Sequence, residues 1–236
     1  MRRLVIVAMM MAAMTAAAQV PLLDSTQMPN AVHFLPPPPA EGSAAFMLDE
    51  AQYRWGVEQR GDSARLAMAL GDAVWSVDNI CRIFGEVMGV DLSKEAAPAI
   101  HRMLTIGLVT TDQAGKLPKN RYMRIRPFVR YNEPTIYPQD EAWLRNNGSY
   151  PSGHTILGWS AALLLTELAP EHADAIMARG YEYGQSRVIA GYHWQSDVDA
   201  ARLAASAAVA CIHADKRFQK LMKKAKKEYR KLTNRH

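Results

Sequence analysis

Residues 148–170 read GSYPSGHTILGWSAALLLTELAP. The stretch opens with Gly, Ser and Pro residues, which favour a turn, and it is apolar from Thr155 to Ala169. Pro170 ends the apolar run. Because the run contains Glu167, it predicts a helix over 154–169 that is buried in a protein core and does not cross a membrane.

Helical spacing of apolar residues continues on both sides of this stretch. We predict further helices over 171–190, 196–214 and 216–232, and earlier ones over 46–70, over 72–88 and from a cap at Ser93 to Leu108. Strand-like alternation is nearly absent. The sequence therefore predicts the all-α class, with a single compact helical domain over 46–214 and no internal repeats.

Two segments are predicted to lack long helices. Residues 111–151 carry five prolines and are expected to form a long loop, which in a compact domain is usually functional. Residues 19–45 are a Pro-rich N-terminal segment, in which Pro36 to Pro39 exclude a helix and favour an extended conformation.

The composition excludes several classes of protein. Of 236 residues, 49% are hydrophobic and 22% are charged, so the chain can bury a core and is not disordered. It has 14 Gly and 13 Pro without a period and two Cys, which excludes collagen and disulfide scaffolds. Cys81 and Cys211 could form one disulfide or stay as separate thiols, and the sequence does not decide between them.

Residues 1–18 have the features of a secretory signal peptide. A short positive start, Met1-Arg2-Arg3, precedes an apolar stretch that ends in three alanines. We expect cleavage after Ala18 and a periplasmic or secreted mature protein. A membrane anchor is the alternative, but these 15 apolar residues are fewer than the roughly 20 that a span needs.

The basic charge of the chain is concentrated at its C-terminal end. The net charge is +5, and residues 215–236 hold ten Lys and Arg but two acidic residues. Residues 19–214 hold 16 basic and 21 acidic residues, a net charge of −5. The segment 215–236 is thus a basic amphipathic helix, which either docks its apolar face on the protein or touches an anionic partner. We expect docking and no binding of nucleic acid.

Three short clusters carry side chains suited to chemistry. They are Lys119 with Arg126-Pro127, then Pro151-Ser152-Gly153-His154, and then Ser186-Arg187 with His193 and Asp197. The second cluster lies at a predicted helix start, where free backbone N–H groups favour an anion, although the same residues also make an ordinary cap. The cations of the other two clusters could bind phosphate oxygens or be solvated at the surface, as could their neighbours Arg121, Arg124 and Arg130.

His193 and Asp197 are four positions apart. If a helix begins by His193, the two side chains share a face, and the carboxylate would fix the tautomer of the imidazole. A polar pair satisfied within the core is the alternative.

Taken together, the clusters resemble the pattern KxxxxxxRP, PSGH and SRxxxxxHxxxD of the type-2 phosphatidic acid phosphatase and vanadium haloperoxidase superfamily. Residues 148–155, together with FLPPPP at 34–39 and GSAAF at 42–46, resemble the bacterial class A non-specific acid phosphatases within it. The resemblance covers most of the chain after residue 18, with no departure inside the motif. It implies a helix-bundle core of the phosphatase and haloperoxidase type.

The resemblance implies a role for each residue. His193 would be the nucleophile, Asp197 would orient it, and His154 would be the general acid. The phosphate oxygens would be held by Lys119, Arg126, Ser152, Gly153 and Arg187. The reaction would need His193 neutral and His154 charged, which predicts a bell-shaped pH profile with an acidic optimum.

The function implied is metal-independent hydrolysis of small phosphate monoesters, with broad specificity, through a phosphohistidine. Transfer of the phosphoryl group to another alcohol is a second expected reaction. No metal or cofactor is implied, phosphate or vanadate would bind as product or inhibitor, and relatives of this class lead us to expect a homo-oligomer.

Two other functions stay open at this stage. A vanadate-dependent haloperoxidase would use the same residues, and an exported phosphate- or polyanion-binding protein without catalytic activity would use the basic C-terminal helix. The leaving group is also unassigned, since Tyr150 and Tyr192 lie beside the motif and could either stack on an aromatic group or fill the core.

Overall fold

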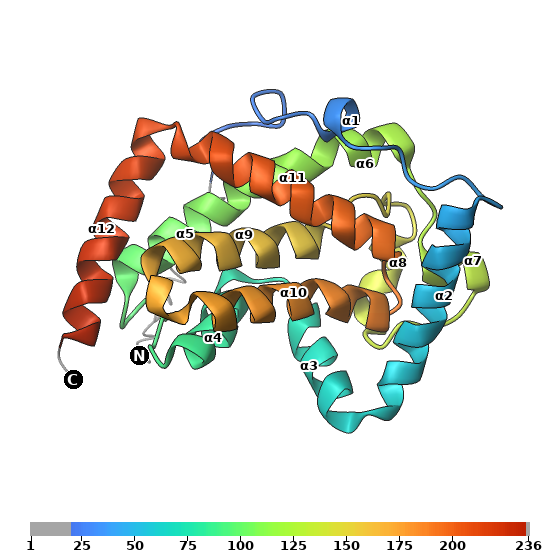
Figure 1. Cartoon of the computed structure of the whole chain (residues 1–236), viewed down its shortest axis with the longest axis horizontal. Helices are drawn as coiled ribbons and strands as arrows, with labels where there is room; N and C mark the ends of the chain where they lie inside the picture. Colours follow the sequence, from blue (N-terminus) through green and yellow to red (C-terminus); the bar gives the residue numbers. More distant parts are fainter. Residues whose placement is uncertain (1–19, 235–236) are drawn as a thin grey trace, which may run out of the picture.

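The computed structural model describes residues 20–234, and the predicted signal peptide at 1–18 lies outside this range. Every regular element in the described part is helical, as the sequence predicts. The centre is made of α9 (Gly153–Leu168), α10 (Ala173–Ile189) and α11 (Gln195–His213). Figure 1 shows α9 between the other two helices.

Helix α9 is buried on nearly all sides because it is apolar all round. Its neighbour α10 comes close at two small residues. A Cβ on Gly158 would stand 2.3 Å from Tyr183 of α10, and one on Gly180 would stand 2.5 Å from the Cβ of Ala162. Glycine at these two positions therefore sets how closely the two central helices pack.

The helix predicted over 46–70 is wrong as a single element. The structure has α2 (Ala44–Glu58), a 3-10 turn at Gln59–Gly61 and α3 (Ser63–Ala73). Asp62 separates the two helices because its carboxylate accepts hydrogen bonds from Ala64 N and Arg65 N, which starts a new helix.

Two further helices begin later than predicted. Helix α4 (Val77–Met88) starts after Ser76, whose hydroxyl accepts from Asn79 N, and ends at Gly89 with φ of 64°. Helix α5 (Pro98–Thr111) is not capped by Ser93. Pro98 takes the first helical position, where the missing N–H costs nothing.

The segment predicted as one long loop, 111–151, contains short helices. They are α6 (Lys116–Tyr122), α7 (Pro127–Tyr131) and α8 (Glu141–Leu144). Pro127 takes the first position of α7 and starts this helix, because the missing N–H of proline costs nothing there. Near the N-terminus, α1 (Ala31–Phe34) is followed by Pro36 to Pro39 without helix, as predicted.

The C-terminal helix α12 (Lys216–Thr233) docks on the protein by its apolar face. Phe218, Met222, Ala225 and Tyr229 are buried, and the helix packs along α5. Glu228 accepts hydrogen bonds from Ala99 N and Ile100 N, which satisfies the start of α5. Figure 1 shows α12 across one end of the central layer and α2 at the other end.

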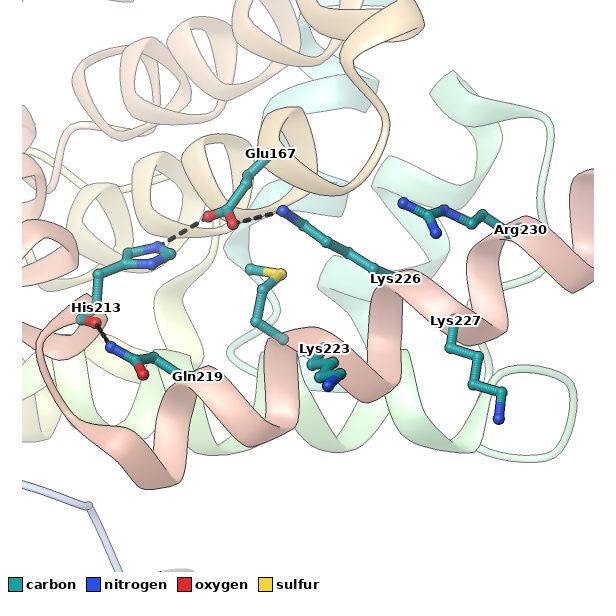
Figure 2. Close-up of a pocket in the computed structure, with 8 residues that line it drawn as sticks. Glu167, His213, Gln219, Lys223, Lys226, Lys227 and Arg230 are labelled. Atoms are coloured by element: carbon teal, nitrogen blue, oxygen red, sulfur yellow. Dashed lines mark hydrogen bonds and ion pairs between the residues drawn. The ribbon is translucent and has the colours of Figure 1, made fainter.

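A cavity of about 530 Å³ lies where α12 meets α9 and α11. Figure 2 shows Glu167 between two basic side chains, with His213 Nε2 at 3.0 Å and Lys226 Nζ at 2.8 Å from its carboxylate. The site residues predicted from the sequence do not line this cavity.

Cys81 and Cys211 are both free thiols in the structure, and burial raises the pKa of Cys81 to about 12. None of the helices in residues 20–234 is both long and apolar enough to span a membrane.

Candidate active site

The three clusters predicted from the sequence meet in space, where α6, α7, α9, α10 and α11 come together. Three hydrogen bonds join them: Lys119 Nζ to the Pro151 carbonyl at 2.5 Å, Ser152 N to the Asp197 carbonyl at 3.0 Å, and Arg126 Nη1 to His193 Nε2 at 2.9 Å. All eight predicted site residues belong to this group. Segments up to 78 positions apart thus build one buried polar site.

His193 and Asp197 lie side by side, but not as two positions on one helix face. Helix α11 begins at Gln195, close to the predicted start at 196, so the condition that a helix begins by His193 is not met. The Asp197 carboxylate accepts from Trp194 N at 2.9 Å, which caps the helix after His193. The same carboxylate oxygen, Oδ2, lies 3.4 Å from His193 Nδ1.

Ser149 is a member of this site that the sequence analysis missed. Its hydroxyl donates to Asp197 Oδ2 and lies 3.2 Å from His193 Nδ1, so it bridges the carboxylate and the imidazole. The side chain is fully buried. A serine in a turn has no sequence signal that separates this role from an ordinary one.

Arg124 is the second residue missed, and it is not an exposed neighbour. Its Nη1 donates to the other carboxylate oxygen of Asp197 at 2.6 Å, and its Nη2 donates to Asp49 Oδ2 at 2.7 Å. Asp49 on α2 in turn accepts from Ser196 N at 2.8 Å. Both oxygens of Asp197 are therefore fixed, so its orientation beside His193 is determined by buried partners.

Lys119 and Arg126 are held by the same carbonyl. Gly148 O accepts from Lys119 Nζ at 3.1 Å and from Arg126 Nη2 at 3.3 Å. A Cβ at residue 148 would stand 2.7 Å from the Lys119 carbonyl oxygen, so only glycine permits this approach. Burial, with the neighbouring Arg126, lowers the pKa of Lys119 to about 7, and burial lowers the pKa of Arg126 to about 9.

Arg187 is the least satisfied charged group of the site. It lies near the end of α10, fully buried, with its guanidinium carbon 4.4 Å from the centre of the Tyr192 ring. None of its three nitrogens has a hydrogen-bond partner among the residues that the structure describes. A buried guanidinium without partners is costly, and a bound anion would supply the missing acceptors.

Ser152, Gly153 and His154 start helix α9. Ser152 Oγ accepts from Thr155 N at 3.3 Å and from Thr155 Oγ1 at 2.9 Å, so it caps the helix and its own O–H proton stays available. His154 Nε2 lies 3.1 Å from the Ala73 carbonyl oxygen. Since a carbonyl only accepts, Nε2 carries a proton, and Nδ1 is the nitrogen that can gain or lose one.

The surroundings of the two site histidines disfavour a positive charge on either ring. Burial and the nearby Arg187 lower the pKa of His154 well below the ordinary value. Burial, Arg126 and Lys119 do the same for His193. Burial, followed by the neighbouring charges, thus favours the neutral form of both rings. The charge that the reaction would need on His154 stays a prediction.

The aromatic residues around the site divide into buried and exposed ones. Tyr150 is buried and donates to the Pro36 carbonyl at 2.7 Å, and Tyr192 is buried and donates to the Tyr137 carbonyl. Both therefore fill the core. Trp75, in the turn between α3 and α4, is half exposed and its ring centre lies 4.6 Å from that of His154.

A buried carboxylate completes the surroundings. Asp112 Oδ1 lies 3.8 Å from the point where a Cβ on Gly153 would stand, and burial raises the pKa of this carboxyl. Within residues 20–234, no group of three or more His, Cys, Asp or Glu side chains is arranged to hold a metal ion.

Comparison with known proteins gives consistent matches across these clusters. The family model described as the PAP2 superfamily matches residues 100–220, which include Lys119 to Asp197. The chain is 46% identical over 211 residues to the non-specific acid phosphatase of Providencia stuartii, with 89% of this chain and 85% of that protein covered. It is 44% identical over 201 residues to the non-specific acid phosphatase of Salmonella typhimurium, with 84% and 80% covered.

A more distant relative matches over a similar length. The acid phosphatase of Zymomonas mobilis subsp. mobilis is 37% identical over 199 residues, with 84% of this chain and 75% of that protein covered. The resemblance inferred from the three clusters is confirmed, and the chain belongs to the PAP2 superfamily, among the bacterial non-specific acid phosphatases.

Proposed function

We propose that this acid phosphatase hydrolyses phosphate monoesters without a metal, through a phosphohistidine on His193. Acid phosphatase activity follows from its family, and the steps below are inferred from the geometry. The observation that best supports the proposal is the environment of the Arg187 guanidinium. A fully buried guanidinium with three unpartnered nitrogens, beside Arg126 and Lys119, fits a phosphoryl group as the missing partner.

Binding of the phosphoryl group would use charge and preformed donors. Arg187 offers a planar fork to two oxygens, while Lys119 and Arg126 supply two further cations. The Ser152 hydroxyl and the free N–H groups at the start of α9 would complete the cradle. Such donors stabilise the charge that spreads over the equatorial oxygens during phosphoryl transfer.

In the first step, His193 Nε2 would attack phosphorus. Arg126 now donates to this nitrogen, and a bound phosphate oxygen would take that hydrogen bond and free the lone pair. The Nε2–P bond forms, the ester P–O bond breaks, and the leaving oxygen takes the proton of His154 Nδ1. Asp197 and Ser149 hold the proton on His193 Nδ1 and stabilise the positive ring that results.

In the second step, water would attack the phosphohistidine. His154 Nδ1, which has lost its proton, accepts one from the water as the P–N bond breaks, and His193 returns to its neutral form. A second alcohol in place of water would give phosphotransfer by the same steps.

The acidic optimum would then have a specific cause. Burial and Arg187 disfavour a proton on His154, so we infer that the proton arrives with the substrate. The negative charge of the phosphoryl group would compensate the positive charge of Lys119, Arg126 and Arg187. It would thereby make protonation of His154 more favourable. A monoanionic ester, which predominates below a second pKa of about 6, brings that proton with it.

The test is hydrolysis of p-nitrophenyl phosphate from pH 4 to 8 with EDTA present. We expect turnover by the wild type and none by His193→Ala, while the exposed Arg121→Ala keeps full activity. Turnover that needs added metal, or equal turnover by His193→Ala, would contradict the proposal. Export after cleavage at Ala18 and assembly into a homo-oligomer stay predictions from the sequence.

A further inference from the structure

We propose that Trp75 forms a subsite for the leaving group, which favours phosphate esters of alcohols that carry an uncharged planar aromatic group, such as a nucleoside. The proposal rests on the proposed function, because it takes His154 as the residue that protonates the leaving oxygen.

Trp75 borders the acid and the phosphate cradle at the same time. Its ring centre lies 4.6 Å from that of His154, with an angle of 71° between the planes. The outer edge of the indole, at Cη2, lies 3.5 Å from the point where a Cβ on Gly153 would stand. The indole therefore lies beside His154, the proposed acid for the leaving oxygen, and beside Gly153 of the phosphate cradle.

Trp75 also connects the buried site with the protein surface, because its side chain is partly exposed to solvent. His154 is 6% exposed, and Arg187 and Ser152 are fully buried, but Trp75 is 50% exposed. In an in-line displacement, the leaving oxygen lies opposite the attacking His193, so the rest of the alcohol extends away from the buried side. A planar group that follows this direction meets the exposed surface of the indole.

Hydrogen bonds fix the backbone that carries Trp75. Asn79 Nδ2 donates to the Gly71 carbonyl at 2.9 Å and to the Val74 carbonyl at 3.2 Å, which fixes the turn around Trp75. Ser76 then caps α4 directly after it. A rigid aromatic surface loses little conformational freedom when a ligand stacks on it.

The two other aromatic residues next to the motif do not offer such a surface. Tyr150 is 3% exposed and Tyr192 is fully buried, and each donates its hydroxyl proton to a backbone carbonyl. Tyr192 also covers Arg187 with its ring. Of these three rings, Trp75 alone has area left for a ligand.

The sharpest test compares two substrates with the same reacting alcohol. Adenosine 5′-monophosphate and ribose 5-phosphate both lose phosphate from a primary ribose oxygen, and one of them lacks the aromatic base. We expect Trp75→Ala to lower the ratio of kcat/KM for the nucleotide to that for the sugar phosphate by about fivefold, the size of one aromatic contact. Trp75→Phe should keep most of the ratio, and Trp75→Leu should lower it as Ala does.

Trp55→Ala is the matched control. Trp55 is also partly exposed, but it lies with Gln52, Arg65 and Tyr181 around a separate cavity. Its variant should keep the wild-type ratio. An unchanged ratio in both Trp75→Ala and Trp75→Leu, or an equal fall in Trp55→Ala, would overturn the subsite. If the wild type cleaved neither ester, the proposed function itself would fail, which is a different result from an unchanged ratio.

Discussion

Arg126 Nη1 lies 2.9 Å from His193 Nε2, and this contact defines which nitrogen of the imidazole holds the lone pair. A guanidinium only donates, so Nε2 accepts and the ring proton is on Nδ1, facing Ser149 and Asp197. Burial and the cations Arg126 and Lys119 lower the pKa of the same ring, which keeps it neutral. These contacts thus hold His193 in the form that a nucleophile needs.

Replacing Arg187 should separate stability from anion binding. Arg187→Met removes a buried charge without partners, so the unliganded protein should gain roughly 1–3 kcal/mol of unfolding free energy. The increase in Tm that phosphate gives the wild type should disappear in the variant. Thermal unfolding with and without phosphate measures both effects. The control Arg121→Met should match the wild type, and a phosphate-induced shift that persists in Arg187→Met would contradict the assignment.

The affinity for a dianion should fall as the pH rises past about 7. Burial and the neighbouring Arg126 lower the pKa of Lys119 to about 7, so the side chain is charged below this pH and neutral above it. Sulfate keeps its charge over this range, so its inhibition constant reports on the protein alone. We expect the inhibition constant to rise by up to tenfold per pH unit above pH 7.

Lys119→Arg provides the comparison for this pH effect. Arginine keeps its charge at every pH used, so the inhibition constant of sulfate should vary much less between pH 6 and 9 in the variant. A wild-type constant that stayed flat over the same range would show that Lys119 does not contribute its charge to the anion site.

His154 should matter more for poor leaving groups than for good ones. An alkyl alcohol needs a proton as it leaves, so His154→Ala should lower kcat/KM for ribose 5-phosphate by on the order of 10²–10⁴-fold. p-Nitrophenolate leaves without a proton, so kcat/KM for p-nitrophenyl phosphate should fall much less, even where the later water step limits kcat. Steady-state kinetics with the two esters gives both numbers. Equal losses would mean that His154 does not act as the acid.

Arg124 should act through Asp197 and not on the phosphate. Arg124→Met frees one oxygen of Asp197, and the misplaced imidazole should lower kcat on the order of tenfold to a hundredfold. Sulfate inhibition should change little, because Arg124 contacts Asp49 and Asp197 and not the cradle. Loss of sulfate binding in proportion to kcat would instead make Arg124 part of the anion site.

The core of the fold and most of the site residues could be predicted from the sequence, because local signals mark them. The helices α9 to α12 follow from local signals, such as Pro170 after an apolar run and the spacing of Phe218, Met222 and Tyr229. Asp62, which caps α3, is the one local signal for the break between α2 and α3. The helical spacing of apolar residues continues across it and predicts a single helix. The sequence predicted Pro98 inside a helix capped at Ser93 and Pro127 in a loop, whereas each proline takes the first position of a helix.

The features of the site that the sequence did not predict depend on contacts between residues far apart in the chain. Ser149, Arg124 and Trp75 act on residues up to 79 positions away, and nothing in their own neighbourhood marks them. The lowered pKa of His154 results from burial together with Arg187, His193 and Arg126, which only the folded chain brings near it.

The central claim is a phosphoryl group on His193, and trapping that intermediate tests it most directly. His154→Ala is mixed with p-nitrophenyl phosphate, because the variant lacks the base for the water step and should accumulate the intermediate. The reaction is quenched in alkali, where phosphohistidine survives, and the peptides are analysed by mass spectrometry. We predict one added phosphoryl group on His193. A phosphoryl group on another residue, or release of p-nitrophenol without any phosphorylated peptide, would contradict the account.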